Sequence, residues 1–335
     1  MIDVIIMWLD GNDPEWLLEK NKYADKDVSA GSDENRFRSW DNLKYVFRGI
    51  EKNMPWVRTV HLVTWGHVPE WLNLDAPKLK VVTHDDYMPK KYLPTFSSHP
   101  ISLNFHRITT LSENFIILND DTFIIRPMKV SDFFYKGRVP RAQSGLSTIN
   151  SNDMRDLMPH TYVNNNAIIN SQFNARKVMK NNFFKYISLR NGIDSVCRYI
   201  LLLPFSLNRI QHPNTPHFPP AMTKSTYEEV WKSYPDIMDK TSRTKFRSAT
   251  DVSDYLLQQW QISRGNFLPR NIKGRSVYVE SYPKDIPKLK RALRNRRIQQ
   301  VCINDHSVEG NFEEIKKKVN SILDERLPDK SSFEK

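Results

Sequence analysis

The stretch FIILNDDTFIIRP, from Phe115 to Pro127, decides the fold that we predict for this chain. Its first four residues are branched or aromatic, and a short apolar run of this kind is typical of a strand buried on both faces. Asn119, Asp120 and Asp121 follow at the carboxyl end of that strand. Ligands bind at this end in open α/β sheets, and two adjacent carboxylates there make an oxygen site for Mg²⁺ or Mn²⁺ holding a phosphate. A plain strand-ending turn is the alternative, because Asn and Asp are common turn formers.

The same arrangement recurs at other strand ends. Two more apolar strands stop at acidic or amide residues: Ile2 to Leu9 before Asp10 and Asp13, and Gln299 to Ile303 before Asn304 and Asp305. Carboxyl ends of parallel strands meet at one edge of a sheet, so the repetition favours a shared ligand site over a set of unrelated turns. For Asp10 and Asp13 the alternative is a capped turn that enters a short helix at Pro14, and the residues can do both.

Strands alternate with amphipathic helices up to residue 125. Apolar runs at residues 57–64 and 79–83 predict strands, and Leu43, Val46, Phe47 and Ile50 recur at helical spacing within residues 41–52. This alternation predicts an α/β fold with a mostly parallel, Rossmann-like sheet flanked by helices.

The chain changes character in its middle. Residues 129–207 are rich in asparagine and contain a predicted helix at residues 176–189, which indicates a helical insertion or an acceptor subdomain. Packing alone would also explain its apolar residues. We therefore expect residues 1–128 and 208–327 to form the two parts of one catalytic domain, and residues 328–335 to be a disordered tail.

Composition sets the broad class. The 335 residues are 39% hydrophobic and include 20 prolines, which suits an ordinary soluble enzyme, and two cysteines argue against a disulfide framework. No leader and no apolar run of about 20 residues is found, so we expect a cytoplasmic protein. The net charge of +12 favours polyanionic partners. The run KLKRALRNRR, residues 288–297, fits either a helix against anionic lipid or a solvated basic face.

One histidine and three arginines are candidate site residues. His217 lies in the proline-rich stretch QHPNTPHFPP, where a fixed backbone can hold an imidazole in place, although a lone histidine is more often structural. Arg36 and Arg38 precede the helix that begins near Asp41, and Arg247 lies in a basic segment. Arginines of this kind grip phosphate, and plain surface charge is the simpler alternative for each.

Several long motifs resemble, in order, the characteristic regions of the Stealth family of microbial hexose-1-phosphate transferases. They cover most of the chain outside residues 129–207: IDVIIMWLDGNDPEW (2–16), RFRSWDNLKYVFRGIEKNMPWVRTVHLVTWGHVPEWL (36–72), LPTFSSHPI (93–101), HRITTLSENFIILNDDTFIIRP (106–127), HFPPAMTKSTYEEVWKSYP (217–235), DKTSRTKFRSATD (239–251) and CINDH (302–306). The animal lysosomal-enzyme GlcNAc-1-phosphotransferase is similar to this family.

The resemblance implies a nucleotide-sugar transferase-like fold and a specific reaction. A nucleotide-sugar, often UDP-linked as in UDP-GlcNAc, donates a hexose-1-phosphate such as GlcNAc- or GalNAc-1-phosphate to a hydroxyl of a glycan or lipid-linked oligosaccharide. The products are a phosphodiester and a nucleoside monophosphate. This implies no nucleic-acid partner, and a peripheral contact at the inner face of the membrane is among the partners we expect.

The resemblance also assigns residues. The positions that match family motifs are Asp10, the pair Asp120 and Asp121, His217, Arg247, and Asn304 with Asp305, while Asn42 departs from a usual glutamate after Asp41. Our hypothesis is that Asp120, Asp121 and Asp305, with Asp10, hold a divalent Mg²⁺ or Mn²⁺ ion on the diphosphate. Arg247 would then steady the developing charge.

Other polar residues complete the predicted site. We expect substrate contacts from Asp13, Arg36, Arg38, Asp41, Asn119 and Asn304. His217 would accept the proton of the acceptor hydroxyl, with a metal-bound aspartate as the rival base. Two other functions stay open: a metal-dependent glycosyltransferase that releases a nucleoside diphosphate, and a non-catalytic module that binds polyanions.

Overall fold

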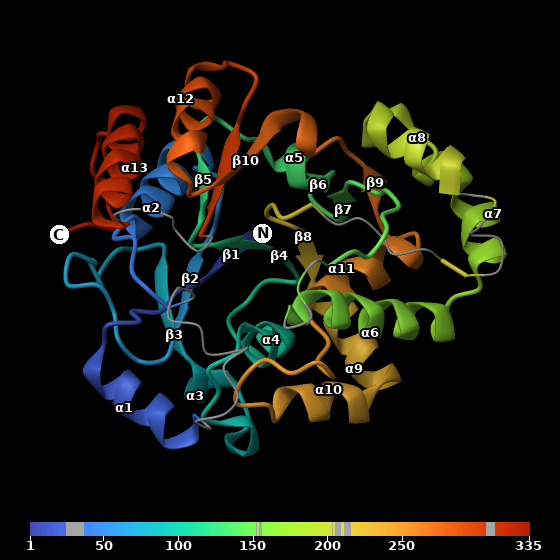
Figure 1. Cartoon of the computed structure of the whole chain (residues 1–335), viewed down its shortest axis with the longest axis horizontal. Helices are drawn as coiled ribbons and strands as arrows, with labels where there is room; N and C mark the ends of the chain where they lie inside the picture. Colours follow the sequence, from blue (N-terminus) through green and yellow to red (C-terminus); the bar gives the residue numbers. More distant parts are fainter. Residues whose placement is uncertain are drawn as a thin grey trace.

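The computed structural model of the chain describes residues 1–24, 37–151, 153, 156–202, 204, 209–210, 216–305 and 312–335. Within them, the main sheet has the order β3-β2-β1-β4-β8 (Figure 1). Its strands are β3 (Leu79–Thr83), β2 (Val60–Thr64), β1 (Ile2–Met7), β4 (Asn114–Asn119) and β8 (Ala221–Thr223). The first four run parallel and β8 is antiparallel to β4. The predicted α/β class with a mostly parallel sheet is confirmed.

The alternation of side chains along the central strands explains why both faces of the sheet are covered. In β1, Val4 and Ile6 point into one core and Ile5 into the other, and in β4 Ile116 and Ile117 divide in the same way. Successive side chains of a strand point to opposite faces, so a continuous apolar run demands two covering layers.

Helices supply those two layers. One is built from α2 (Leu43–Asn53), α12 (Ile286–Arg294) and α13 (Phe312–Arg326), and the other from α4 (Ser98–Leu103), α6 (Leu157–Gln172), α9 (Lys224–Ser233), α10 (Pro235–Ser242) and α11 (Asp254–Ser263). The two groups lie on opposite sides of the main sheet in Figure 1. Further helices are α1 (Pro14–Tyr23), α3 (His84–Tyr87) and α5 (Val130–Phe133).

A second sheet begins where the main sheet stops. Only Asp120 and Asp121 separate β4 from β5 (Thr122–Ile124), which pairs antiparallel with β11 (Gln300–Asn304), and β11 pairs parallel with β10 (Ser276–Glu280). The acidic turn therefore lies where the chain passes from one sheet to the other. This position brings the end of β11 to the turn, as the sequence pattern predicts.

The segment 129–207 is mainly helical and is tied to the later part of the chain. Its β7 (Val139–Ala142) pairs with β6 (Phe134–Tyr135) and with β9 (Leu268–Pro269), and its helices include α7 (Ala175–Tyr186) and α8 (Ile193–Leu202). A third, smaller core joins residues of this segment to Ile262 and Phe267. The domain boundaries themselves stay predictions.

The end of the chain differs from the disordered tail that we expected at residues 328–335. Phe333 is buried in the main core, and Glu334 makes an ion pair of 2.8 Å with Arg48 of α2. Leu72 and Glu334 also form a β-bridge. The prediction was wrong because the polar sequence of this segment does not indicate that Phe333 packs in a core formed elsewhere, or that Glu334 pairs with the buried Arg48. No described helix is both long enough and apolar enough to cross a lipid bilayer.

Candidate active site

The centre of the site is Asp121, held between the two sheets. The backbone amide of Ile303 in β11 donates to its carbonyl oxygen at 2.8 Å. Its side chain accepts at Oδ1 from the Thr122 hydroxyl at 2.9 Å, and at Oδ2 from the Cys302 thiol at 3.3 Å. Strand pairing therefore fixes both the backbone and the carboxylate of Asp121.

His217 reaches the same carboxylate from a distant part of the chain. Its Nε2 lies 3.3 Å from Oδ2 of Asp121, and its Nδ1 lies 2.7 Å from the hydroxyl of Tyr255 in α11. The ring of Tyr278 in β10 stands edge-on to the imidazole, with 6.3 Å between centroids. Both ring nitrogens thus have partners, and the ring is fixed by three separate elements.

The charges of this group are coupled. Burial acts to raise the pKa of Asp121, but hydrogen bonds from His217, Thr122 and Cys302 outweigh it and hold that pKa below its ordinary value. Burial acts to lower the pKa of His217, but the hydrogen bond and charge of Asp121 raise it. Burial and the charge of Asp121 raise the pKa of Cys302, so the thiol stays protonated.

Asp120 is the member of the pair whose carboxyl group is harder to ionise. Desolvation of its carboxyl group, followed by the charge of Asp121, raises its pKa above the ordinary value, although the residue is exposed to solvent. Two neighbouring carboxylates repel each other unless a proton or a cation lies between them. Asp120 and Asp121 together therefore offer the oxygen ligands that Mg²⁺ or Mn²⁺ prefers.

The donor set that the structure gathers is narrower than the predicted one. Among the described residues, a single group of three or more His, Cys, Asp or Glu side chains has all its ligand atoms within 4.8 Å of one another, namely Asp121, His217 and Cys302. Asp10 and Asp305 are outside it. A protonated thiol is a poor ligand for Mg²⁺, so the two aspartates fit a hard divalent ion better than this trio does.

Asp305 has other partners than the predicted cation. Arg38 donates to it from Nε at 2.6 Å and from Nη2, Trp40 donates at 3.0 Å, and the Ser281 hydroxyl donates at 3.3 Å. The guanidinium of Arg38 also stacks on Phe312, 4.2 Å from the ring centroid. The arrangement makes Asp305 an anchor for Arg38, and its role as a metal ligand stays a prediction.

The loop after β1 is braced by its acidic residues. Asp13 caps α1 by accepting from the Trp16 amide at 2.8 Å, and Asp10 accepts from the Asn12 amide at 3.0 Å. The Asp10 amide donates to Nε2 of His67 at 2.8 Å. Gly11 is required because an added Cβ would lie 1.6 Å from the carbonyl oxygen of Phe37. This close approach joins the β1 loop to the segment that carries Arg38.

The remaining predicted substrate residues lie around this edge. Asn119 and Asn304 are the last residues of β4 and β11, and both are half-buried. Asp41 lies at the start of α2 with φ +52° and forms an ion pair with Lys316, which gives it a structural partner rather than a free carboxylate. Arg36 lies outside the described residues.

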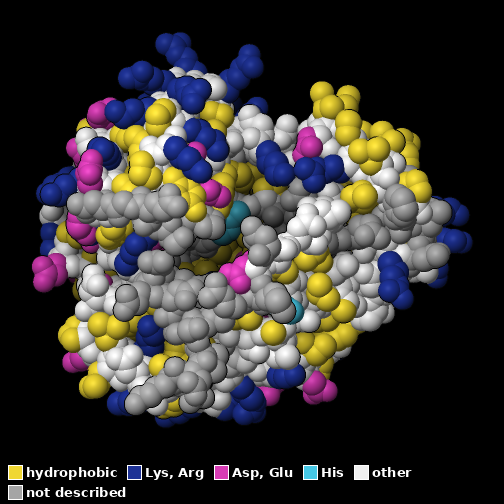
Figure 2. Space-filling model, viewed as in Figure 1, with side chains coloured by type: hydrophobic (Ala, Val, Ile, Leu, Met, Phe, Trp, Pro, Cys, Tyr) yellow, Lys and Arg dark blue, Asp and Glu magenta, His cyan; other side chains and the backbone are white. Residues whose placement is uncertain are grey.

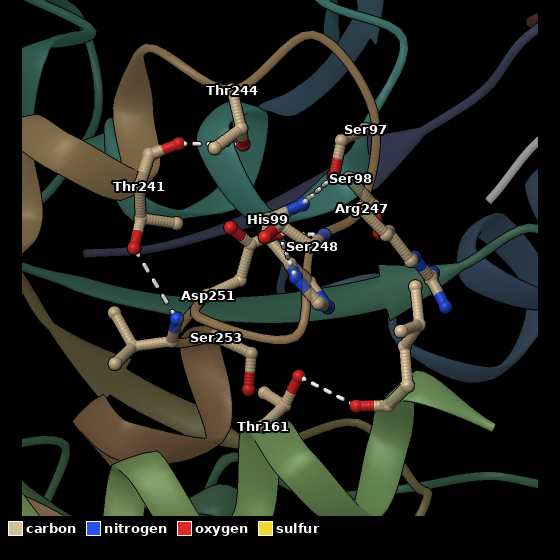
Figure 3. Close-up of polar contacts among 12 residues, drawn as sticks. Ser97, Ser98, His99, Thr161, Thr241, Thr244, Arg247, Ser248, Asp251 and Ser253 are labelled. Atoms are coloured by element: carbon tan, nitrogen blue, oxygen red, sulfur yellow. Dashed lines mark hydrogen bonds and ion pairs between the residues drawn. The ribbon is translucent and has the colours of Figure 1, made fainter. Parts of the chain in front are cut away.

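Hydrogen bonds and ion pairs hold the loop that carries Arg247 in place (Figure 3). The Asp251 carboxylate accepts from the Ser248 amide at 2.9 Å and lies 3.3 Å from Nδ1 of the buried His99. Arg247 donates from Nη2 to the Ser98 hydroxyl at 3.0 Å. The motifs LPTFSSHPI and FRSATD are therefore two halves of one structure that sets the position of the Arg247 guanidinium.

Arg247 and His217 share an electrostatic neighbourhood at Asp254. Burial raises the pKa of Asp254, and the charges of His99, His217 and Arg247 act against that rise. The charges of the predicted base and of the predicted arginine thus both act on Asp254. Sequence reasoning missed Asp254, Tyr255 and Cys302.

A small recess is lined by residues that flank His217 in the chain. Pro216 and Phe218, the two neighbours of His217, line it together with Arg141 and Gln143 of the segment 129–207 and Gln261 of α11. Figure 2 shows a hollow near the middle of this face with a histidine and acidic side chains at its rim.

Known proteins resemble this chain over its full length. Residues 36–142 match the family model described as Stealth protein CR2, conserved region 2. Capsular polysaccharide phosphotransferase WcwK of Streptococcus pneumoniae is 36% identical over 100% of this chain and 98% of its own length. Receptor polysaccharide phosphotransferase WefC of Streptococcus gordonii is 34% identical over 99% and 98%, respectively. Exopolysaccharide phosphotransferase cps2G of Lactiplantibacillus plantarum is 32% identical over 100% and 96%.

Solved structures resemble the chain more remotely. The galactosyltransferase LgtC, in complex with donor and acceptor sugar analogues, has a TM-score of 0.40 at 9% identity, covering 98% of this chain and 96% of LgtC. The bifunctional glycosyltransferase WbbM has a TM-score of 0.43 at 11% identity, covering 98% of this chain and 50% of WbbM.

Proposed function

Because this chain belongs to the Stealth family and is, like its relatives, a transferase of phosphorus-containing groups, we propose that it moves a hexose-1-phosphate from a nucleotide-sugar to a glycan hydroxyl. The donor in this proposal is UDP-linked GlcNAc or GalNAc. The acceptor is a glycan or a lipid-linked oligosaccharide met in the cytoplasm, at the inner face of the membrane.

The reaction makes one bond and breaks one. The acceptor oxygen attacks the β-phosphorus of the nucleotide-sugar, and the bond from that phosphorus to the oxygen bridging the two phosphates breaks. The hydroxyl proton passes to a base, the nucleoside monophosphate leaves, and the sugar-1-phosphate stays on the acceptor as a phosphodiester. Such a transfer depends on positioning and on neutralising charge more than on covalent chemistry.

One observation carries the proposal: Nε2 of His217 lies 3.3 Å from Asp121, the carboxylate at the end of the central strand. If Nδ1–H of His217 donates to the oxygen of Tyr255, Nε2 is the basic nitrogen and faces the acidic turn. His217 would accept the hydroxyl proton at Nε2, while Asp121 stabilises the resulting imidazolium.

Two arginines fit the anionic donor. Arg247, held by Ser98 beside His217 and Asp254, is suited to the charge that develops on the transferred phosphoryl group. Arg38, anchored by Asp305, which Trp40 also holds, is suited to the departing nucleotide phosphate. Asp120 and Asp121 would hold a divalent Mg²⁺ or Mn²⁺ ion, which when bound neutralises the diphosphate.

The segment 129–207 fits the role of an acceptor subdomain. Arg141 and Gln143 of this segment line the same small recess as Pro216 and Phe218, so the segment reaches the residues that flank the proposed base. In this proposal the nucleotide-sugar lies along the carboxyl edge of the main sheet and the glycan approaches His217 from the side of this segment.

The released nucleotide tests the proposal. The purified protein is incubated with UDP-linked sugars, acceptor glycan and Mg²⁺ or Mn²⁺, and the products are separated by anion-exchange chromatography. Sugar-1-phosphate transfer releases UMP. Release of UDP would instead identify a glycosyltransferase. Binding of polyanions that weakens steeply with salt, without release of any nucleotide, would identify a polyanion-binding module.

A further inference from the structure

Helix α8 turns apolar side chains outward. Ile193, Ile200 and Leu201 are 72%, 61% and 71% exposed, while Ser195 and Tyr199 point into the protein. The spacing of seven and eight residues puts the three exposed side chains on one face of the helix. An apolar stripe at helical spacing normally faces a core, so this one is available for something outside the chain.

The preceding residues add three more exposed apolar side chains. Phe183, Phe184 and Leu189 are 43%, 85% and 76% exposed, and the two phenylalanine rings contact each other with centroids 5.5 Å apart. We call these six residues the α7–α8 apolar surface: Phe183, Phe184, Leu189, Ile193, Ile200 and Leu201. Figure 2 shows hydrophobic side chains gathered over α8, with Lys and Arg side chains beside them over α7.

The charge around this surface is strongly positive. From Asn174 to Leu202 the chain contains six basic residues, namely Arg176, Lys177, Lys180, Lys185, Arg190 and Arg198, against one acidic residue, Asp194. The difference is +5 (6 − 1). Asp194 lies 3.2 Å from Arg198, and Lys177, Lys180 and Arg190 are exposed.

We propose that the α7–α8 apolar surface docks on an anionic lipid bilayer. Apolar side chains flanked by basic ones match the interface of such a bilayer, where hydrocarbon lies beneath negatively charged headgroups. A second copy of the chain fits less well, because two faces of the same positive charge would repel each other.

The other basic segment offers no such surface. The run at residues 288–297 forms most of α12, and its apolar residues Leu289, Ala292 and Leu293 are buried in the main core. That helix presents charge alone to solvent, so the solvated face is the better account of it. The α7–α8 surface combines both features that a membrane contact needs.

The inference builds on the proposed function, since it says how the enzyme meets a lipid-linked acceptor, but its test is independent of catalysis. The full chain is mixed with vesicles of phosphatidylcholine alone or with phosphatidylglycerol, and the bound fraction is measured by flotation. We expect binding to the anionic vesicles and little to the neutral ones. Failure of the wild type to bind anionic vesicles overturns the inference.

Matched variants locate the contact. The double variant Ile200→Ser with Leu201→Ser should lower partition into anionic vesicles at least about tenfold, because two large apolar side chains are lost. The control is Leu18→Ser with Leu74→Ser, two side chains that are 65% and 57% exposed elsewhere. Equal losses in the two variants would overturn the inference. Phe184→Ser is the second test variant, since its 85% exposure makes an effect on folding small.

Charge and oligomeric state complete the test. Lys180→Glu with Arg190→Glu should abolish the preference for anionic vesicles, and unchanged binding would contradict the proposed contact. A dimer of the wild type that Leu201→Ser disperses would identify a second copy as the occupant instead. UMP release with a soluble acceptor is measured in parallel, and activity in a variant that no longer docks separates loss of docking from failure of the proposed reaction.

Discussion

Replacing Tyr255 by phenylalanine tests whether the position of His217 controls turnover. The change removes the 2.7 Å hydrogen bond to Nδ1 and keeps the ring that packs in α11. One intramolecular hydrogen bond is worth about 0.5 to 1.5 kcal/mol, and 1.4 kcal/mol corresponds to a tenfold change in rate. We therefore expect kcat to fall about 2- to 12-fold. The KM for the nucleotide-sugar should change little, because Tyr255 is a positioning residue and touches the base rather than the donor.

The assay is the steady-state release of UMP at saturating donor and acceptor, with thermal unfolding measured in parallel. Tyr186→Phe is the matched control, since it removes a buried tyrosine hydrogen bond, 2.6 Å to the Ile262 carbonyl, away from His217. That control should lose stability and keep its kcat. A kcat of Tyr255→Phe equal to that of the wild type, or an equal fall in the control, would refute the reasoning.

Three further predictions follow from particular contacts. His217→Ala should lower kcat by about 10² to 10⁴ if His217 is the general base, whereas the exposed His160→Ala should not, and a near-normal rate would remove His217 from that role. Asp305→Asn should raise the KM for the nucleotide-sugar, because Arg38 loses its anchor. The divalent-metal concentration that gives half the maximal rate should stay unchanged. A change in that concentration would instead identify Asp305 as a metal ligand. Asp3 is buried, and although burial acts to raise its pKa, bonds from His61, Arg58 and the Ser112 amide hold it well below 3.8. Its contribution to stability is therefore present above about pH 4 and is lost as the pH falls further. Asp3→Asn should lower the free energy of unfolding, measured with urea at pH 7, by about 3 to 5 kcal/mol. Below about pH 4 the free energy of unfolding of this variant should depend less on pH than that of the wild type.

The strands of the main sheet could be predicted because local pattern determines them. The apolar run at Phe115 to Leu118 matches β4, and the run at residues 79–83 matches β3 at both ends. Runs of branched residues need burial on both faces, which a parallel sheet provides. The same reasoning predicted that acidic residues would meet at one edge, and Asp121 does lie beside the end of β11.

Partnerships between distant residues could not be predicted. Asp305 and Arg38 are 267 residues apart, and nothing near Asp305 indicates that an arginine, rather than a cation, neutralises it. The pairing of Glu334 with Arg48 is equally remote, so the tail was expected to be disordered. Both contacts depend on the register and packing of elements that only the folded chain brings together.

The most direct measurement follows the β-phosphorus of the donor. A UDP-sugar labelled with radioactive phosphorus in the β-position is incubated with the enzyme, acceptor and divalent metal, and the label is traced to the glycan or the nucleotide. If Asp121, His217 and Arg247 act on phosphorus, the label enters the glycan in the wild type and does so about 10² to 10⁴ times more slowly in His217→Ala. Label that remains entirely on the released nucleotide would contradict the account.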